Sequence, residues 1–551
     1  MNDRPGGAAP QVQSPEIGGV LEAPPGSGKR YERTGRAAPP WLWAAGLLVL
    51  VPIGVPVASM LARVLGASDG AWDVLFDART AELVLRSALL TLLVTTAATV
   101  IGIAAAWIIV RTDLGAPRLW GVLMLLPLVI PSYVFALSFL AATGPRGLVA
   151  DLTGIAVPFL DGLPGAWLAL TLSTFPYVFL VTAAALQRLD PALEEAARGL
   201  GASTWRVFRT VTLPLLRPAV GAGALLAALY TLSDFGAVSL MRFDAFTRVI
   251  YAQYAGRLDR TPAAVLSIAL IVIALGILWA EQRTRGRASH YSHRPIRRPT
   301  RHRLEGRRRA VAVLFLGTIA ALGVIVPVTV LVAWVVRGID AGEQIAVPWN
   351  AVAGSVVGSV LAAVLAMAAA LPVVVLAVRY RSRRTEALER SVYVMFSLPH
   401  ITVALAVLIF AVRYLGPLYQ SLALLVVIYA TMFLAQATGA AKASLLQVDP
   451  HLEEAARSLG KGPFRVLRDV TIPLIWRGLL AGGALVFLTT MKELPATLLL
   501  RPTGFETLAV RIWAAADELF YARAATAALV LLAVSAVPAY VLIVRPKDAT
   551  S

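Results

Sequence analysis

Long apolar runs separated by short polar segments make up most of the chain from residue 41 onward. Each run is about 20 residues long, the length that an α-helix needs to cross the hydrocarbon core of a bilayer. The runs lie at 41–62, 84–110, 119–142, 166–185, 219–240, 262–280, 311–336, 352–378, 392–413, 421–440, 479–500 and 524–544. The pattern predicts an all-α polytopic membrane protein with about twelve transmembrane helices.

The apolar runs form two tandem sets of six, because the sequence repeats between the halves. Pro191 and Pro450 are 259 positions apart, whereas Pro131 and Pro399, nearer the start of each set, are 268 apart. The difference, 268 − 259 = 9, indicates an insertion of about nine residues near 143–165 of the first half. Since each half has an even number of spans, we expect two parallel six-helix repeats with a pathway between them.

Charge clusters between the runs predict which segments face the cytoplasm. Segment 63–83 carries more acidic than basic residues, whereas 281–310 is dense in arginine. The positive-inside rule therefore places 63–83 outside and 281–310 inside. We predict a disordered cytoplasmic tail at 1–39, a first half at 40–280, an Arg-rich cytoplasmic linker at 281–310, a second half at 311–545, and both termini in the cytoplasm.

Composition agrees with a membrane protein and excludes several functions. Hydrophobic residues make up 58% of the chain, and the formal net charge is +18. The basic excess belongs to the expected cytoplasmic loops, and no basic groove with interleaved aromatic residues is visible, so we expect membrane lipid and no nucleic acid as a partner. The absence of cysteine excludes thiol catalysis, disulfides and thiolate metal sites.

One polar stretch occurs twice, once in each half. The copies read LDPALEEAARGLGASTWRVFRTVTLPLLRP from residue 189 and VDPHLEEAARSLGKGPFRVLRDVTIPLIWR from residue 448. We call the segments 187–218 and 446–477 the first and second repeated loops. Neither is apolar enough to cross a bilayer, so both lie in water on the same side of the membrane.

Each repeated loop predicts a short helix of about ten residues. An Asp can cap its start, a Pro fits its first turn, and a Gly can adopt the left-handed conformation after its end. These residues are Asp190, Pro191 and Gly201, and Asp449, Pro450 and Gly460. The apolar face, with Leu193, Ala196, Ala197 and Leu200 in the first copy, is suited to docking in a groove. A helix lying on lipid is the alternative, which the small alanines and the duplication disfavour.

The repeated loops resemble the cytoplasmic loop signature of ABC importer permeases. That signature is Glu-Ala-Ala, three residues, Gly, nine residues, then an aliphatic residue, any residue, Leu or Ile, and Pro. The matching residues are Glu195, Ala196, Ala197, Gly201, Val211, Leu213 and Pro214, and Glu454, Ala455, Ala456, Gly460, Val470, Ile472 and Pro473. The resemblance implies a type I ABC importer permease fold. It also implies two copies of a cytoplasmic ATP-binding subunit, each receiving one short helix.

A narrower resemblance concerns the cargo. MKELPATLLLRPTGFETLAVRIW at 491–513 and SDFGAVSLMRFDAFTRVIYAQY at 233–254 are similar to the ferric iron permeases of the ABC importers, which are fused double-length chains. This implies a permease of the bacterial inner membrane for iron(III) delivered by an extracytoplasmic iron-binding protein. Related permeases carry thiamine, phosphonates, polyamines or sulfate, and those cargoes remain alternatives.

Ionisable residues within predicted spans are the candidates for the pathway. Asp234 and Glu493 are 259 positions apart, so a carboxylate recurs in both halves. Our candidate pathway residues are Asp234, Glu493, Lys492, Pro131 and Pro399. A structural ion pair between Glu493 and Lys492 is an equal alternative.

Three further residues near the candidate pathway have more than one interpretation. His400 takes the position of Ser132, which favours a hydrogen-bonded histidine over a metal ligand. Tyr133 and Tyr177 fit packing as well as gating. A metal site remains undetermined.

Catalysis by this chain is not expected. The nearest string to a phosphate-binding loop, at 26–30, lacks the required spacing and hydroxyl, so ATP would be used by the partner and no cofactor is expected here. A secondary transporter is the competing class, but it would not need paired docking loops. A membrane-embedded enzyme would need clustered His and carboxylates within the spans, and none is visible.

Overall fold

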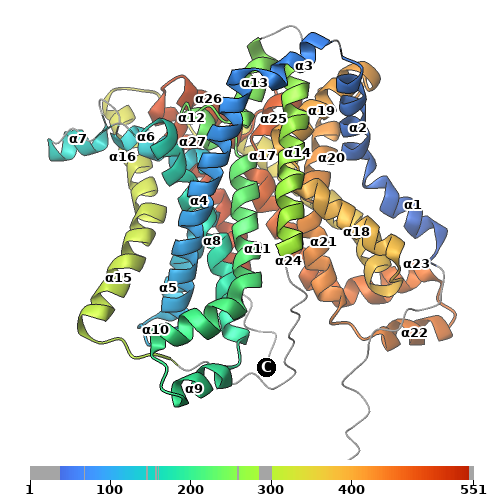
Figure 1. Cartoon of the computed structure of the whole chain (residues 1–551). Coiled ribbons are helices and arrows are strands. Elements are labelled where there is room, and N and C mark those ends of the chain that lie inside the picture. The colour runs from blue at the N-terminus through green and yellow to red at the C-terminus, as the bar shows by residue number, and fades with distance from the viewer. Residues whose placement is uncertain are drawn as a thin grey trace, which may run out of the picture.

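A computed structural model describes residues 38–67, 69–143, 147–154, 158, 160–256, 260–284 and 301–544. The predicted tail at 1–39 lies outside the described residues except for 38 and 39, and the predicted linker at 281–310 is described only at its two ends. Within the described ranges the elements are helices, and an isolated β-bridge joins Thr112 to His302 (Figure 1). The all-α fold class is confirmed.

The first half contains the following elements: α1 Pro40–Leu48, α2 Val51–Leu65, α3 Asp69–Phe76, α4 Ala78–Arg111, α5 Pro117–Leu125, η1 Leu126–Leu128, α6 Ser132–Thr143, α7 Leu148–Thr153, α8 Gly162–Arg188, α9 Pro191–Gly199, α10 Thr204–Val207, η2 Phe208–Thr212, α11 Leu213–Ser233, α12 Gly236–Leu240, α13 Phe246–Gly256 and α14 Thr261–Thr284. The short helix α7 occupies the insertion that the repeat predicts near 143–165. It has no counterpart among the elements of the second half described next.

The second half contains α15 Gly306–Ala320, η3 Ala321–Ile325, α16 Val326–Asp340, α17 Trp349–Arg379, α18 Arg383–Phe396, α19 His400–Tyr414, α20 Leu422–Met432, α21 Leu434–Leu445, α22 Pro450–Ser458, α23 Pro463–Val466, η4 Leu467–Thr471, α24 Ile472–Met491, α25 Pro495–Leu500, α26 Leu508–Asp517 and α27 Tyr521–Val544. Helix α15 begins at Gly306, inside the segment that we assigned to the linker. Its first turn is a run of arginines, which have high helix propensity and extend the apolar helix into water.

The described residues form nine helices that are long and apolar enough to cross a membrane, or up to twelve if each of three bent pairs is one span. The prediction of about twelve spans is therefore confirmed. The repeated loops lie at the same end of the molecule, on opposite sides of it, and α3, from the acidic segment 63–83, lies at the opposite end (Figure 1).

Six of the predicted spans are interrupted, which hydropathy did not reveal. The run at 41–62 bends by 52° between α1 and α2, and the run at 421–440 bends by 53° between α20 and α21. The run at 392–413 bends by 100° between α18 and α19, and the run at 119–142 breaks between α5 and α6. Proline lacks an amide hydrogen and disfavours a helical residue before it, and both breaks contain proline. The runs at 219–240 and 479–500 end as helices at Ser233 and Met491, before short second helices begin.

Two large apolar clusters each contain buried residues from both halves. Helices α1 and α2 of the first half pack against α17 and α19 of the second, while α15 and α16 pack against α5 and α6 (Figure 1). One cluster of buried residues joins Phe135 of the first half to Leu316 and Leu508 of the second. The first helix of each half thus holds the opposite half, and the space between the halves is fixed by this exchange.

Candidate functional site

The short helix of each repeated loop has the predicted boundaries. The Asp190 carboxylate accepts a hydrogen bond from the Ala192 amide at 3.0 Å, and Asp449 accepts one from His451 at the same distance. Gly201 has a φ of 84°, and the equivalent glycine of the second loop has one of 83°. The predicted caps and left-handed glycines are confirmed.

A buried carboxylate fixes the first repeated loop to the end of a transmembrane helix. The Glu194 side chain is fully buried and lies 3.1 Å from the Arg111 guanidinium, at the end of α4. It accepts a hydrogen bond from the Thr212 hydroxyl at 2.9 Å. Thr212 closes η2, a π-helical turn that joins α10 to α11 and precedes Pro214. Glu194 therefore joins α9 both to the end of α4 and to the π-helical turn of the same loop.

The second repeated loop is anchored by the equivalent residues. The Arg379 guanidinium, at the end of α17, donates from Nε and Nη2 to the Glu453 carboxylate at 3.1–3.2 Å and from Nη2 to the Val448 carbonyl at 3.2 Å. The Thr471 hydroxyl donates to Glu453 at 3.1 Å. Our sequence analysis missed both anchors. The 268-position match of Arg111 to Arg379 was the signal that could have found them.

The opposite face of each short helix is exposed. Leu200 is 89% exposed and Leu459 is 83% exposed, each just after the helix end. Among the residues selected from the signature, Glu195, Ala196, Glu454 and Ala455 are also exposed, whereas Ala197 is half-buried and Ala456 is buried. Pro214 and Pro473 lie in the first turns of α11 and α24, near the end of each repeated loop. An exposed apolar row next to an anchored inner face is typical of a docking helix.

The described end of the linker lies against the first anchor. The His302 amide donates to the Arg111 carbonyl at 2.7 Å, and the Leu304 amide donates to the Asp113 carboxylate at 2.7 Å. The His302 ring stacks on Trp107, with ring centroids 5.8 Å apart. The linker end therefore covers the junction between α4 and the first repeated loop.

Docking of the linker end is expected to weaken as the pH falls. Burial lowers the pKa of His302 below the ordinary value of 6.5, and the positive charge of Arg198 lowers it further. The folded protein therefore favours neutral histidine, so this stabilisation is complete above pH 6.5 and is lost progressively below it. Amide hydrogen exchange at 301–305, corrected for the intrinsic rate, should show less protection at about pH 5.5 than at about pH 7.5.

The matched control for this pH effect is His302→Phe. Phenylalanine can stack on Trp107 but does not titrate, so the variant should keep the same protection at both pH values. An equal pH response in His302→Phe and in the unchanged protein would show that another group is responsible.

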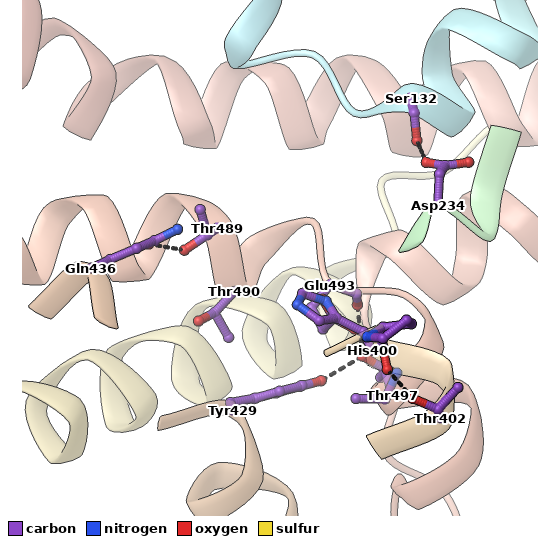
Figure 2. A network of polar contacts seen from close by, with 12 residues as sticks. Ser132, Asp234, His400, Thr402, Tyr429, Gln436, Thr489, Thr490, Glu493 and Thr497 are labelled. Carbon is purple, nitrogen blue, oxygen red and sulfur yellow. Dashed lines mark hydrogen bonds and ion pairs between the residues drawn. The ribbon is translucent and has the colours of Figure 1, made fainter. Parts of the chain in front are cut away.

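A cavity of about 510 Å³ lies between the halves, and we call it the inner cavity. Asp234, Glu493, Lys492 and Pro131 line it, but Pro399 is not among its lining residues and instead precedes α19 as its N-cap. Figure 2 shows the two carboxylates on separate sides, one with Ser132 and the other with His400. The structure thus brings together four of the five residues that we selected from the sequence.

The lining of the inner cavity comes largely from equivalent positions of the two halves. Under the offsets of 259 and 268, the equivalent pairs are Ser132 and His400, Tyr177 and Gln436, Tyr230 and Thr489, Ser233 and Lys492, Asp234 and Glu493, Phe235 and Leu494, and Gly236 and Pro495. The axis that relates the halves therefore passes through the cavity. The chemistry of the two sides differs, because Tyr177 corresponds to Gln436, Ser233 to Lys492 and Ser132 to His400.

Both carboxylates sit in the helix breaks that hydropathy missed. Asp234 accepts hydrogen bonds from the Ala237 amide at 2.9 Å and from the Ser132 hydroxyl. Glu493 accepts one from the Ala496 amide at 3.2 Å. Each carboxylate thus caps the short helix that follows it, α12 or α25. Capping of α12 and α25 therefore gives a structural reason for a carboxylate at this position in both halves, in addition to its position in the cavity lining.

The ion pair between Glu493 and Lys492, which the sequence left as an equal alternative, is not formed. Lys492 donates to the Leu128 carbonyl of the first half at 2.6 Å, whereas Glu493 pairs with His400 Nδ1 at 2.8 Å. Lys492 closes α24 as its C-cap residue, so its side chain leaves in another direction from that of its neighbour. The hydrogen-bonded interpretation of His400 is confirmed.

Two tyrosines that we left open between packing and gating both line the inner cavity. Tyr133 is 3% exposed, and its hydroxyl has no hydrogen-bond partner among the described residues. Within the described ranges no group of three or more His, Cys, Asp or Glu side chains could hold a metal ion.

Comparison with known proteins agrees with this arrangement. The family model described as "Binding-protein-dependent transport system inner membrane component" matches residues 98–280 and again residues 362–546. Each match contains one repeated loop and one of the two cavity carboxylates. The duplication of this family unit confirms the two fused permease halves.

Named relatives include proteins of full and of half length. The chain is 33% identical to the Fe(3+)-transport system permease protein FbpB 2 of Haemophilus influenzae over 92% of this chain and 98% of that protein. It is 35% identical to the molybdenum transport system permease protein ModB of Escherichia coli over 34% of this chain and 87% of that protein. It is 28% identical to the probable sulfate transport system permease protein cysT of Chlorokybus atmophyticus over 46% of this chain and 92% of that protein. This chain therefore belongs to the family of inner membrane components of binding-protein-dependent transport systems, as an ABC importer permease with two fused halves.

Proposed function

We propose that this permease carries iron(III) across the inner membrane of a bacterium. The observation that carries the proposal is similarity over nearly the whole length of a fused relative that is named as an Fe(3+)-transport permease. The inner cavity adds chemical support, because carboxylate and phenol oxygens are hard donors suited to a trivalent cation. An extracytoplasmic iron-binding protein would deliver the ion at the end of the molecule that carries α3.

Two copies of a cytoplasmic ATP-binding subunit would dock on the two repeated loops. The exposed rows that end in Leu200 and Leu459 are the contact surface that we assign to them. ATP is used by those subunits, and this chain binds no cofactor. The repeated loops then face the cytoplasm, as do both termini, while lipid surrounds the apolar helices and nucleic acid is not a partner.

The cavity carboxylates would act as weak electrostatic stations rather than as tight ligands. Asp234 already accepts hydrogen bonds from Ser132 and Ala237, and Glu493 from Ala496 and His400. These bonds use lone pairs that would otherwise bind the ion, so each carboxylate attracts the cation without trapping it. Conduction requires this balance between entry and release.

Changing Asp234→Asn together with Glu493→Gln is expected to slow ferric iron uptake by about tenfold, which corresponds to ~1.4 kcal/mol of barrier. The amide side chains keep an oxygen that can cap α12 and α25, so the abundance of the protein should not fall. Uptake of labelled ferric iron in reconstituted vesicles, divided by the permease content, measures the effect.

Asp244→Asn is the matched control for the double variant. Asp244 pairs with Arg248 outside the inner cavity, so its loss should leave the normalised rate unchanged. An unchanged rate in the double variant would mean that the two carboxylates are not on the route. Loss of the protein itself would mean that their role is to hold the helix breaks.

An oxyanion permease is the second candidate, and Lys492 is the observation that favours it. Its ammonium group lies in the lining of the inner cavity, where it would attract an anion and repel a cation. The half-length relatives named for molybdenum and sulfate transport match this chain over single halves. Uptake of molybdate or sulfate that is lost in Lys492→Met, with no uptake of ferric iron, would establish this function instead.

A further inference from the structure

A second cavity, of about 480 Å³, is formed within the second half, and we call it the side cavity. It is bounded by the end of α17, by α18 and by α21, and its volume lies within the range of small-molecule binding sites. Its charged lining residues are Arg381, Glu386, Glu389, Arg390 and Lys442. None of these five residues lines the inner cavity, so the side cavity has a chemistry of its own.

The side cavity lies where transmembrane helices end on the side of the repeated loops. Arg381 follows α17 just after Arg379, the anchor of the second repeated loop, and Lys442 lies in the last turn of α21, which leads into that loop. Helix α18 bends by 100° from α19, and Figure 1 shows it inclined above α22 and α23. The side cavity is therefore placed at the level where lipid headgroups meet water.

The side cavity has three cationic side chains and two carboxylates, and both carboxylates are already paired. Lys442 pairs with Glu389, and Arg381 Nε lies 3.1 Å from Glu386. Arg390 follows Glu386 by four residues, a spacing at which two helix residues can pair, but Glu386 is held by Arg381. Among the residues that the structure describes, the exposed Arg390 therefore has no carboxylate partner.

This excess of positive charge suits an anion and disfavours a metal ion. A guanidinium offers paired N–H donors that match the oxygens of a phosphate group. Basic pockets between transmembrane helices are typical sites for anionic headgroups. The side cavity also has an open apolar part, because Tyr393 is 43% exposed and Leu446 is 47% exposed. Charged and apolar surface thus lie side by side, as a phospholipid requires.

The first half does not repeat this set of charges. Under the offsets of 268 and 259, the positions equivalent to the three cations are Asp113, Val122 and Ala183. Arg118 takes the place of Glu386, so the equivalent positions carry one acid and one base with no excess of cations. Asp113 also accepts a hydrogen bond from the Leu304 amide of the linker end at 2.7 Å. An anion site of this kind is therefore expected once in the fused chain.

We propose that the side cavity binds a phosphate group, with Arg390 as its main ligand and with Arg381 and Lys442 as neighbouring cations. The phosphate belongs either to an anionic phospholipid of the adjoining leaflet or to inorganic phosphate in the water on the same side. Either source would give Arg390 the anionic partner that Glu386 does not provide. Bound phosphate would also hold α18 against α21, beside the anchor of the second repeated loop. The proposal does not depend on which cargo is carried.

Binding of two probes by the full chain in detergent tests the proposal and separates the two sources. Native mass spectrometry would measure binding of phosphatidylglycerol, with zwitterionic phosphatidylcholine as the reference lipid. Equilibrium dialysis would measure binding of radiolabelled inorganic phosphate. Arg390→Gln is expected to weaken binding of one of the two probes by about tenfold, because it removes the charge-assisted hydrogen bonds.

Arg383→Gln is the matched control for Arg390→Gln. Arg383 is exposed on the same helix but does not line the side cavity, so its loss removes the same charge without touching the site. Binding of both probes by this variant should equal that of the unchanged chain. Equal weakening by Arg383→Gln and Arg390→Gln would mean that the anion is attracted by surface charge alone, and the proposal would be wrong.

A thiol in the side cavity gives a second measurement that does not need a change at Arg390. The chain contains no cysteine, so Leu446→Cys would carry the single thiol, in the lining of the cavity. The probe that binds should slow the reaction of this thiol with a maleimide by about tenfold. Slowing by phosphatidylglycerol but not by inorganic phosphate or phosphatidylcholine identifies a lipid headgroup, and slowing by inorganic phosphate identifies the soluble anion. If neither probe protects the thiol and neither responds to Arg390→Gln, the side cavity does not bind phosphate.

Discussion

Replacing Gly201 and Gly460 by valine is expected to abolish coupled transport while the protein still accumulates in the membrane. Both glycines have a φ near +84°, where an L-residue with a side chain is strained by about 1–2 kcal/mol, and more if it is β-branched. A Cβ at either position would meet no atom within 4 Å, so the strain arises in the backbone alone. Relief of this strain would change the backbone conformation after the short helix and redirect the chain that follows it.

The exit from the first short helix is held by two backbone hydrogen bonds. The Gly201 amide donates to the Arg198 carbonyl at 2.8 Å, and the Ala202 amide donates to the Ala197 carbonyl at 3.1 Å. Loss of these bonds would change the angle between α9 and α10, and with it the surface offered to the ATP-binding subunit. Membrane level, co-purification of that subunit and uptake of ferric iron should all be measured.

Gly199→Val is the matched control for this prediction. Gly199 is the last residue of α9, has no positive φ and also has open space around it, so valine adds no backbone strain there, and its helix propensity is slightly better than that of glycine. Uptake in this variant should remain close to normal. Normal uptake in both Gly201→Val and Gly460→Val would remove the coupling role that we assign to the turns.

Local chemistry made the repeated loops readable from the sequence. The cap, the proline and the left-handed glycine of each short helix act within a few residues of one another, so no knowledge of the remaining fold was needed. The glutamate that anchors the loop was not predicted. The signature selects Glu195, whereas Glu194 forms the buried contact with Arg111. Successive helix residues point about 100° apart, so only the packing against α4 decides which one is buried.

The arrangement around the inner cavity could be predicted only in part. The offset of 259 related Asp234 to Glu493, but hydropathy counts apolar residues and does not register that the helix stops before each carboxylate. The contacts of Glu493 with His400 and of Lys492 with Leu128 join residues 93 and 364 positions apart. The first contact lies within the second half and the second joins the two halves. Both follow from packing between elements far apart in the chain, which a local sequence pattern does not encode.

Breaking the buried anchor of the second repeated loop by Arg379→Met is expected to destabilise the protein by about 3–5 kcal/mol. The side chains of Arg379 and Glu453 are only 8% and 5% exposed. Without the guanidinium, Glu453 keeps the Thr471 hydroxyl at 3.1 Å and Arg457 at 3.6 Å. These partners compensate the buried charge only in part. Thermal unfolding of the purified complex measures the loss.

Arg381→Met is the matched control for this loss of stability. Arg381 lies two residues further along the chain and pairs with Glu386, but the two side chains are 63% and 39% exposed. Exposed pairs contribute about 0–1 kcal/mol, so the unfolding temperature should change little. An equal loss in Arg379→Met and Arg381→Met would show that burial of the anchor is not the cause.

The double variant Arg379→Met with Glu453→Met removes the ion pair but keeps the packing of the loop on α17. It therefore distinguishes the need for attachment of the loop from a need for the charges themselves. Replacement of a buried ion pair by apolar residues of similar volume is often neutral, and methionine adapts to irregular gaps. Membrane level and thermal stability should therefore return close to those of the unchanged protein. Uptake should return with them, because the loop again packs on the end of α17. If stability returns while uptake remains lost, the ion pair itself takes part in transmitting movement from the ATP-binding subunit, and a purely anchoring role for Glu453 is wrong.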